Sequence, residues 1–137
     1  MKNILFILLF LPVIGFAQTR KDHERAIGRF VKYYNNIQGD SIMRMWENGE
    51  REEWNQKMWS DKSLTSMHKD FGKILSYKYL GIDTEDPNPG LAVFETQFSV
   101  VGWKTTSMTI DKEGWLGTFR FITSSDGINK MLKNKKK

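Results

Sequence analysis

The feature that most constrains the fold is a change of hydrophobic period at Ile74. Before this residue, apolar side chains recur three and four positions apart, which is the spacing of helices with one buried face. After it, apolar and polar residues alternate, which is the pattern of strands with one buried face. A chain with its helices first and its strands afterwards is typical of the α+β class.

Three helices are predicted in the first half. The first covers residues 20–38 and carries a long apolar stripe that ends at a glycine. The second is short, and Met45 and Trp46 are expected on its buried face. The pattern of residues 50–62 does not clearly favour helix or strand, and a polar helical turn followed by a loop is expected there. The third helix is expected over residues 60–73, with a serine cap and a closing glycine.

Four strands are predicted in the second half, joined by the turn sequences TEDPNPG and DKEG and by a glycine between the second and third strands. Short turns between successive strands favour an antiparallel meander. The expected strands are 74–82, 91–101, 103–110 and 115–123. In the second strand, alternation places on the core face Ala92, Phe94, Phe98 and Val100.

The first 17 residues have the layout of a secretory signal peptide. Lys2 precedes an apolar run over residues 4–16, and small residues stand before a cut at Ala17-Gln18. The run is too short for a spanning helix, so an exported protein, periplasmic or secreted, is expected. The chain has no cysteine, so no lipoprotein anchor or disulfide is expected and the core must hold the fold by itself.

The remaining chain predicts one domain over residues 18–123 and a basic tail over residues 124–137. The sequence pI is 9.4, yet residues 18–123 contain 15 Lys and Arg against 15 Asp and Glu, and the excess lies in the lysine-rich tail. A nucleic-acid-binding groove would need clustered basic residues in the folded part, so nucleic acid is not an expected partner. The tail is predicted to be a frayed, solvated end.

The order of these elements resembles the NTF2-like superfamily, and most closely its bacterial exported domains of the DUF3887 type. The resemblance is carried by FVKYYNNIQGDS, MWENG, SLTSMHKDFGKI and the strands LAVFETQFSV, KTTSMTID and WLGTFRFI. It implies a half-open cone, in which the long helix crosses a curved sheet and encloses a pocket or a filled core. That superfamily contains isomerases, cyclases, hydratases and non-catalytic binding modules, so the resemblance does not decide function.

Few residues predict chemistry. His68 lies between Leu64 and Phe71 on the apolar face of its helix, and a partly buried imidazole can act as a general base. Asp70 cannot orient it, because residues two apart point to different sides of a helix. A structural role for His68 is therefore favoured, and His23 is expected to be exposed. No catalytic residue, metal site or cofactor is predicted, because no ligand spacing or catalytic motif occurs.

The aromatic residues supply the other candidates. If the cone is not completely filled, an apolar cavity is expected, and the ligand-pocket candidates are Tyr34, Trp46, Trp59, His68, Phe98 and Trp103. The favoured function is an exported, non-catalytic module that binds a small hydrophobic ligand, an envelope component or a protein partner, with a homodimer through the open sheet as an option. The alternatives are an isomerase- or hydratase-type enzyme using a pocket histidine or tyrosine, and a structural or inhibitory partner of another exported protein.

The segment MWENGEREEWNQKMWSDK combines three tryptophans with four glutamates. Tryptophan and carboxylate are the residue types of sugar-binding clefts, but crowded glutamates without an apolar stripe are typical of a solvated surface. Trp46 is expected in the core. Trp54 and Trp59 are expected to clamp this connector onto the open end of the cone, and a sugar-stacking platform remains the alternative.

Overall fold

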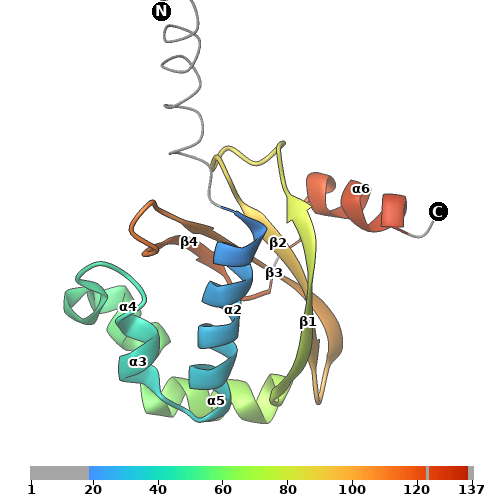
Figure 1. The fold of residues 1–137 in the computed structure, drawn as a ribbon. Helices are drawn as coiled ribbons and strands as arrows, with labels where there is room; N and C mark the ends of the chain where they lie inside the picture. The colour runs from blue at the N-terminus through green and yellow to red at the C-terminus, as the bar shows by residue number, and fades with distance from the viewer. Residues whose placement is uncertain (1–18, 123, 136–137) are drawn as a thin grey trace, which may run out of the picture.

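The structure is a computed structural model that describes residues 19–122 and 124–135. The signal peptide predicted over residues 1–17 lies outside this range. The helices are α2 (Arg20–Asn35), α3 (Gly39–Met43), η1 (Gly49–Arg51), α4 (Glu53–Met58), α5 (Asp61–Phe71) and α6 (Asp126–Lys135), and the strands are β1 (Ile74–Ile82), β2 (Ala92–Phe98), β3 (Gly102–Ile110) and β4 (Leu116–Arg120) (Figure 1). The expected α+β class with a four-stranded antiparallel sheet is confirmed.

Helix α2 begins at a capping box. The Thr19 hydroxyl accepts a hydrogen bond from the Asp22 N–H, and the Asp22 carboxylate accepts one from the Thr19 N–H in return. The buried stripe then follows the expected spacing and ends at Tyr34, which is fully buried. The helix stops at Asn35, whose side-chain amide donates to the Ile74 carbonyl and accepts from the Ile74 N–H. This amide therefore pairs the end of α2 with the edge of β1.

The second helix is shorter than predicted. Helix α3 ends at Met43, and Met45 and Trp46 follow in hydrogen-bonded turns while remaining buried. The reason lies in β4: the Leu116 N–H donates to the Met45 carbonyl at 2.8 Å, and the Trp46 indole N–H donates to the Gly117 carbonyl at 3.0 Å. These bonds connect the segment after α3 to the free edge of β4 instead of continuing the helix.

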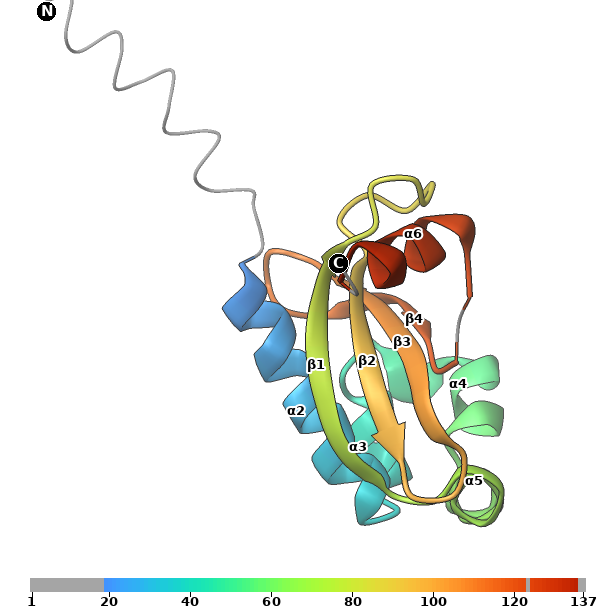
Figure 2. The ribbon, with the colours of Figure 1, turned by 90° about the vertical axis from the view of Figure 1, so that its right-hand side faces the viewer.

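The sheet runs in the order β1-β2-β3-β4, and its two faces are covered differently. Cross-strand pairing puts Ala92, Phe94 and Phe98 on the inner face, against which α2 packs (Figure 1). Val100 was predicted on the same face, but it is 63 % exposed because β2 ends at Phe98 and Val100 lies in the following turn. Figure 2 shows α6 across the other face of the sheet, near one end of the strands.

The predicted frayed tail is wrong for the segment that forms α6. The Ser125 hydroxyl accepts a hydrogen bond from the Ile128 N–H at the start of the helix and donates one to Asp83. Ile128 is 1 % exposed, and Lys130 forms an ion pair with Glu85. The tail is therefore held to the sheet by an apolar side chain, Ile128, which its high lysine content did not indicate. No helix among the described residues is long and apolar enough to cross a membrane.

Candidate functional site

The predicted pocket residues on the inner face fill the core. Trp59, Tyr34 and Phe98 are 1 %, 0 % and 2 % exposed. The ring of Trp59 lies 5.6 Å from that of Phe30, and the ring of Phe98 lies 5.3 Å from that of Phe121. These aromatic rings pack against one another and fill the space between α2 and the sheet.

His68 bridges two helices. Its Nε2 lies 2.7 Å from the Tyr34 carbonyl oxygen, so Nε2 carries the proton and donates it to that carbonyl. The two rings are 4.6 Å apart. The Tyr34 hydroxyl in turn donates to the Gly72 carbonyl at 3.0 Å, and burial raises the pKa of Tyr34 above its usual range. Both hydrogen bonds thus join α2 to the C-terminal end of α5.

The prediction that His23 is exposed is wrong. His23 is 1 % exposed, because it shares the buried stripe of α2 with Ala26, Ile27 and Phe30, three, four and seven positions further on. Its Nδ1 lies 3.0 Å from the Thr19 carbonyl oxygen and donates to it. Its Nε2 has no hydrogen-bond partner among the described residues. The ring acts as a core side chain rather than as a surface base.

The three tryptophans of the connector have separate environments. Trp46 is 6 % exposed and stacks on Trp59 with ring centroids 6.2 Å apart, so both belong to the core. Trp54 is 50 % exposed and meets the Trp46 ring edge to face at 5.8 Å. The four glutamates of the segment are exposed, as expected. Trp59 is therefore part of the core itself and not a clamp at its rim.

Trp103 lies on the other face of the sheet from the remaining candidates. It is 42 % exposed, and the Lys78 ammonium sits 4.8 Å from its ring centroid. The structure therefore brings together Tyr34, Trp46, Trp59, His68 and Phe98 in and around one core, and places Trp103 apart from them.

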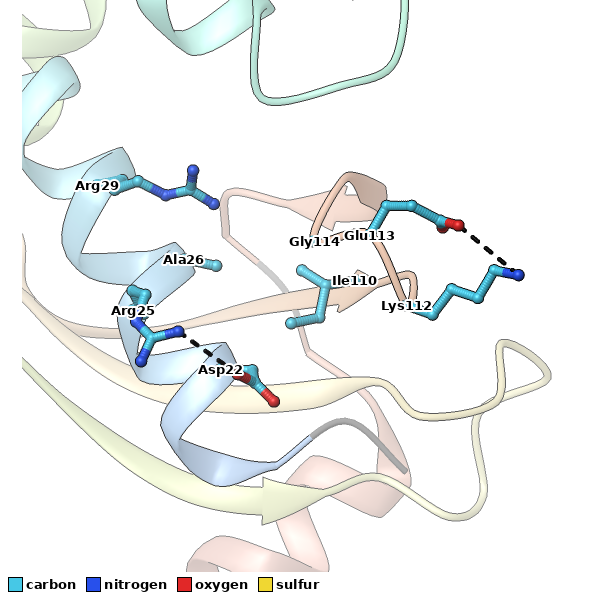
Figure 3. A pocket seen from close by; sticks show the side chains of 8 residues that line it. All are labelled: Asp22, Arg25, Ala26, Arg29, Ile110, Lys112, Glu113 and Gly114. Atoms are coloured by element: carbon cyan, nitrogen blue, oxygen red, sulfur yellow. Dashed lines mark ion pairs between the residues drawn. The ribbon is translucent and has the colours of Figure 1, made fainter. Parts of the chain in front are cut away.

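The surface is hollowed in several places, and one of these hollows lies between α2 and the β3–β4 hairpin. A hollow of about 370 Å³ is lined on the helix side by Asp22, Arg25 and Arg29, and on the hairpin side by Lys112 and Glu113 (Figure 3). A second hollow of about 190 Å³ adjoins it and shares Arg29, Glu113 and Gly114. We call the surface formed by these two hollows the helix–hairpin groove.

The hairpin side of the groove is held by Asp111. Its carboxylate accepts hydrogen bonds from the Glu113 N–H and the Trp115 N–H, both at 2.9 Å. Gly114 supplies the positive φ, +89°, that closes the turn. This network fixes the loop that presents Glu113 to the groove and places Trp115, which is 37 % exposed, at its second hollow.

The charges of the groove are unevenly paired. Asp22 lies 3.7 Å from Arg25, and its pKa is lowered chiefly by its hydrogen bonds to Thr19. Glu113 lies 3.7 Å from Lys112. Arg29 is exposed, extends from α2 toward the hairpin in Figure 3, and makes no hydrogen bond or ion pair with any described residue. The groove therefore offers one free guanidinium where its two hollows meet.

Sequence reasoning did not select the groove residues. Asp22, Arg25, Arg29 and Tyr33 recur at helical spacing and lie on one side of α2, which was visible in the sequence as a polar stripe beside the apolar one. That the DKEG turn lies over this stripe depends on the coiling of the sheet. Comparison of the chain with protein-family models, with curated proteins and with solved structures finds no match, so the resemblance to NTF2-like proteins stays a prediction.

Proposed function

We propose that this protein is an exported, non-catalytic binding module whose ligand is an anionic component of the cell envelope, held in the helix–hairpin groove. The observation that carries the proposal is the free Arg29 guanidinium at the junction of the two hollows. A guanidinium presents a planar fork of donors that matches a carboxylate or a phosphate group in two parallel hydrogen bonds.

The neighbouring charges favour an anion as ligand. The two acidic side chains that line the groove each have a basic neighbour, Asp22 with Arg25 and Glu113 with Lys112. A cationic ligand would compete with those neighbours for the carboxylates, whereas an anionic ligand can pair with Arg29, which has no partner among the described residues. The Ser41 and Tyr33 side chains also line the second hollow and carry hydroxyl groups that can donate to the same ligand.

The packing of the core favours a ligand bound at the surface, and it argues against a small hydrophobic ligand bound inside the fold. The candidate wall residues Tyr34, Trp59 and Phe98 pack on other aromatic rings. The isomerase or hydratase alternative would use a pocket histidine or tyrosine, whereas the His68 Nε2–H and the Tyr34 hydroxyl both donate to backbone carbonyls. These contacts support a binding role.

The test compares Arg29→Gln with Lys69→Gln, a matched loss of one positive charge. Lys69 is exposed on α5 and does not line the groove. Binding of sodium glucuronate and of inorganic phosphate would be measured by calorimetry and thermal shift at low salt. We expect both Lys69→Gln and the unaltered protein to bind at least one probe, and Arg29→Gln to bind it about tenfold more weakly, as expected for a charge-assisted pair.

Two results would overturn the proposal. One is that neither probe binds the unaltered protein. The other is that Arg29→Gln and Lys69→Gln weaken binding equally, because attraction would then come from net charge and not from the groove. Circular dichroism of both variants establishes that they are folded, which is expected since both side chains are exposed.

A further inference from the structure

The helix–hairpin groove continues beyond its second hollow. A third hollow of about 330 Å³ shares Arg44 and Trp115 with the second and extends to Arg51. Arg44 is committed to Glu50, with its Nε 2.6 Å from the carboxylate. Arg51, in η1, is exposed and forms no ion pair or hydrogen bond through its side chain with the described part of the chain. The extended groove therefore contains a second free guanidinium.

The three hollows place binding groups in a definite order. Arg29 joins the first hollow to the second, Trp115 joins the second to the third, and Arg51 lines the third. The Trp115 ring is 37 % exposed, so part of an apolar, flat surface stands between two free cations. Asn48 adds an amide group at the third hollow, where it can bond to hydroxyl groups.

The length of the surface exceeds a small ion or a single sugar. Along α2 alone the groove runs from Asp22 to Tyr33, which is about 16 Å at the rise of an α-helix. The third hollow then extends it past Trp115 toward Arg51. A ligand that pairs with both free guanidinium groups has to extend across the second hollow and past Trp115, which a chain of several units can do.

We propose, on the basis of the proposed function above, that the ligand is an acidic polysaccharide bound across all three hollows. Two carboxylate groups of the chain pair with Arg29 and Arg51, and a sugar ring between them stacks on Trp115. The sequence of cation, ring and cation along the groove matches a polymer in which acidic groups and sugar rings alternate.

A nucleic acid also alternates anionic groups with rings, but the charges of this surface favour the polysaccharide. Binding to a nucleic acid depends on neutralising many phosphates with Lys and Arg. In this groove Arg25, Arg44 and Lys112 each have an acidic neighbour, at 3.7, 2.6 and 3.7 Å. Two free guanidinium groups suit a chain with sparser charges and with hydroxyl groups between them.

The experiment measures binding of galacturonic acid, its trimer and its hexamer, with a thymidine oligonucleotide of equal charge as the competing class. We expect the hexamer to bind at least tenfold more tightly than the monomer and the oligonucleotide. Arg51→Gln and Trp115→Ala should each weaken hexamer binding about tenfold, because the hexamer contacts all three hollows, whereas Arg51→Gln should leave the monomer bound at Arg29. Lys69→Gln should change neither.

The outcomes separate this inference from the proposed function. If monomer and hexamer bind equally and only Arg29→Gln weakens them, the extended site is wrong and the anion site at Arg29 stands. If the oligonucleotide binds as tightly as the hexamer, the assignment to polysaccharide is wrong. If no acidic probe binds, both proposals fail together. Circular dichroism of Arg51→Gln and Trp115→Ala, two exposed positions, establishes that they fold.

Discussion

The packing of Trp59 makes a quantitative prediction about stability. This side chain is 1 % exposed and touches the rings of Phe30, Trp46 and Phe119 at centroid distances of 5.6, 6.2 and 5.7 Å. Replacing a large aromatic side chain in a core by alanine lowers the free energy of unfolding by about 3–5 kcal/mol, so we expect that loss for Trp59→Ala. With a typical urea dependence of about 2 kcal/mol per molar, the denaturation midpoint falls by about 2 M.

Trp54 provides the matched control, because it lies five positions earlier in the same segment and is 50 % exposed. Trp54→Ala removes one edge-to-face contact with Trp46 and an exposed hydrogen bond to Glu52, and is expected to cost about 0.5–1 kcal/mol. Trp59→Phe should fall between the two, since the Trp59 indole N–H has no hydrogen-bond partner among the described residues and only ring area is lost. Unfolding would be followed by far-ultraviolet circular dichroism, because fluorescence changes when tryptophan is removed. Equal losses for Trp54→Ala and Trp59→Ala would refute this account of the core.

Three further predictions follow from backbone and charge contacts. Gly39→Ala should lower the free energy of unfolding, measured by urea denaturation, by more than about 2 kcal/mol, because an added Cβ would overlap the carbonyl oxygen of Trp59 and the backbone would have to move. An unchanged denaturation midpoint would contradict this close approach. Asn35→Ala should cost about 2–3 kcal/mol, because it leaves a backbone N–H and carbonyl at the edge of β1 without their partners; a loss below about 0.5 kcal/mol would show that these bonds add nothing. Hydrogen bonds from Arg120, and to a lesser degree from Asn88, lower the pKa of Asp86 from 3.8 to about 2, so the folded state binds fewer protons there than the unfolded state. This stabilisation is complete above about pH 4 and is lost as the pH falls toward 2. Urea midpoints measured across that range should fall less steeply for Arg120→Gln than for the unaltered protein, and parallel curves would exclude this pair as a source of acid sensitivity.

Local signals in the sequence predicted the elements that local contacts determine. The third helix has its Ser60 cap and ends before Gly72, whose φ of +83° few other residues adopt. Strand β1 has the predicted bounds because the alternation begins and ends there. The spacing of the α2 stripe also held, and applying it one turn earlier would have placed His23 in the core.

Elements fixed by distant contacts could not be predicted in the same way. The second helix stops early because Met45 bonds to a strand that lies about seventy residues further along the chain. Trp54 and Trp59 look alike in the sequence, and only the docking of their segment makes one exposed and the other buried. The groove has the same origin, because Arg29 and the DKEG turn meet only after the sheet has coiled over α2.

The two edge strands of the sheet, β1 and β4, differ in how many backbone groups they leave available for pairing with a second copy of the chain. At β4, the Met45 carbonyl and the Trp46 indole occupy backbone groups that another strand would need. At β1, the described residues cover the outer backbone groups of the first residue alone, through the Asn35 amide, and Lys78 lies in the middle of the strand. An antiparallel pairing of two copies centred on β1 would bring one Lys78 next to the other, and this repulsion weakens as salt screens it. Strand-by-strand association of this protein should therefore begin at β1 and should be promoted by salt.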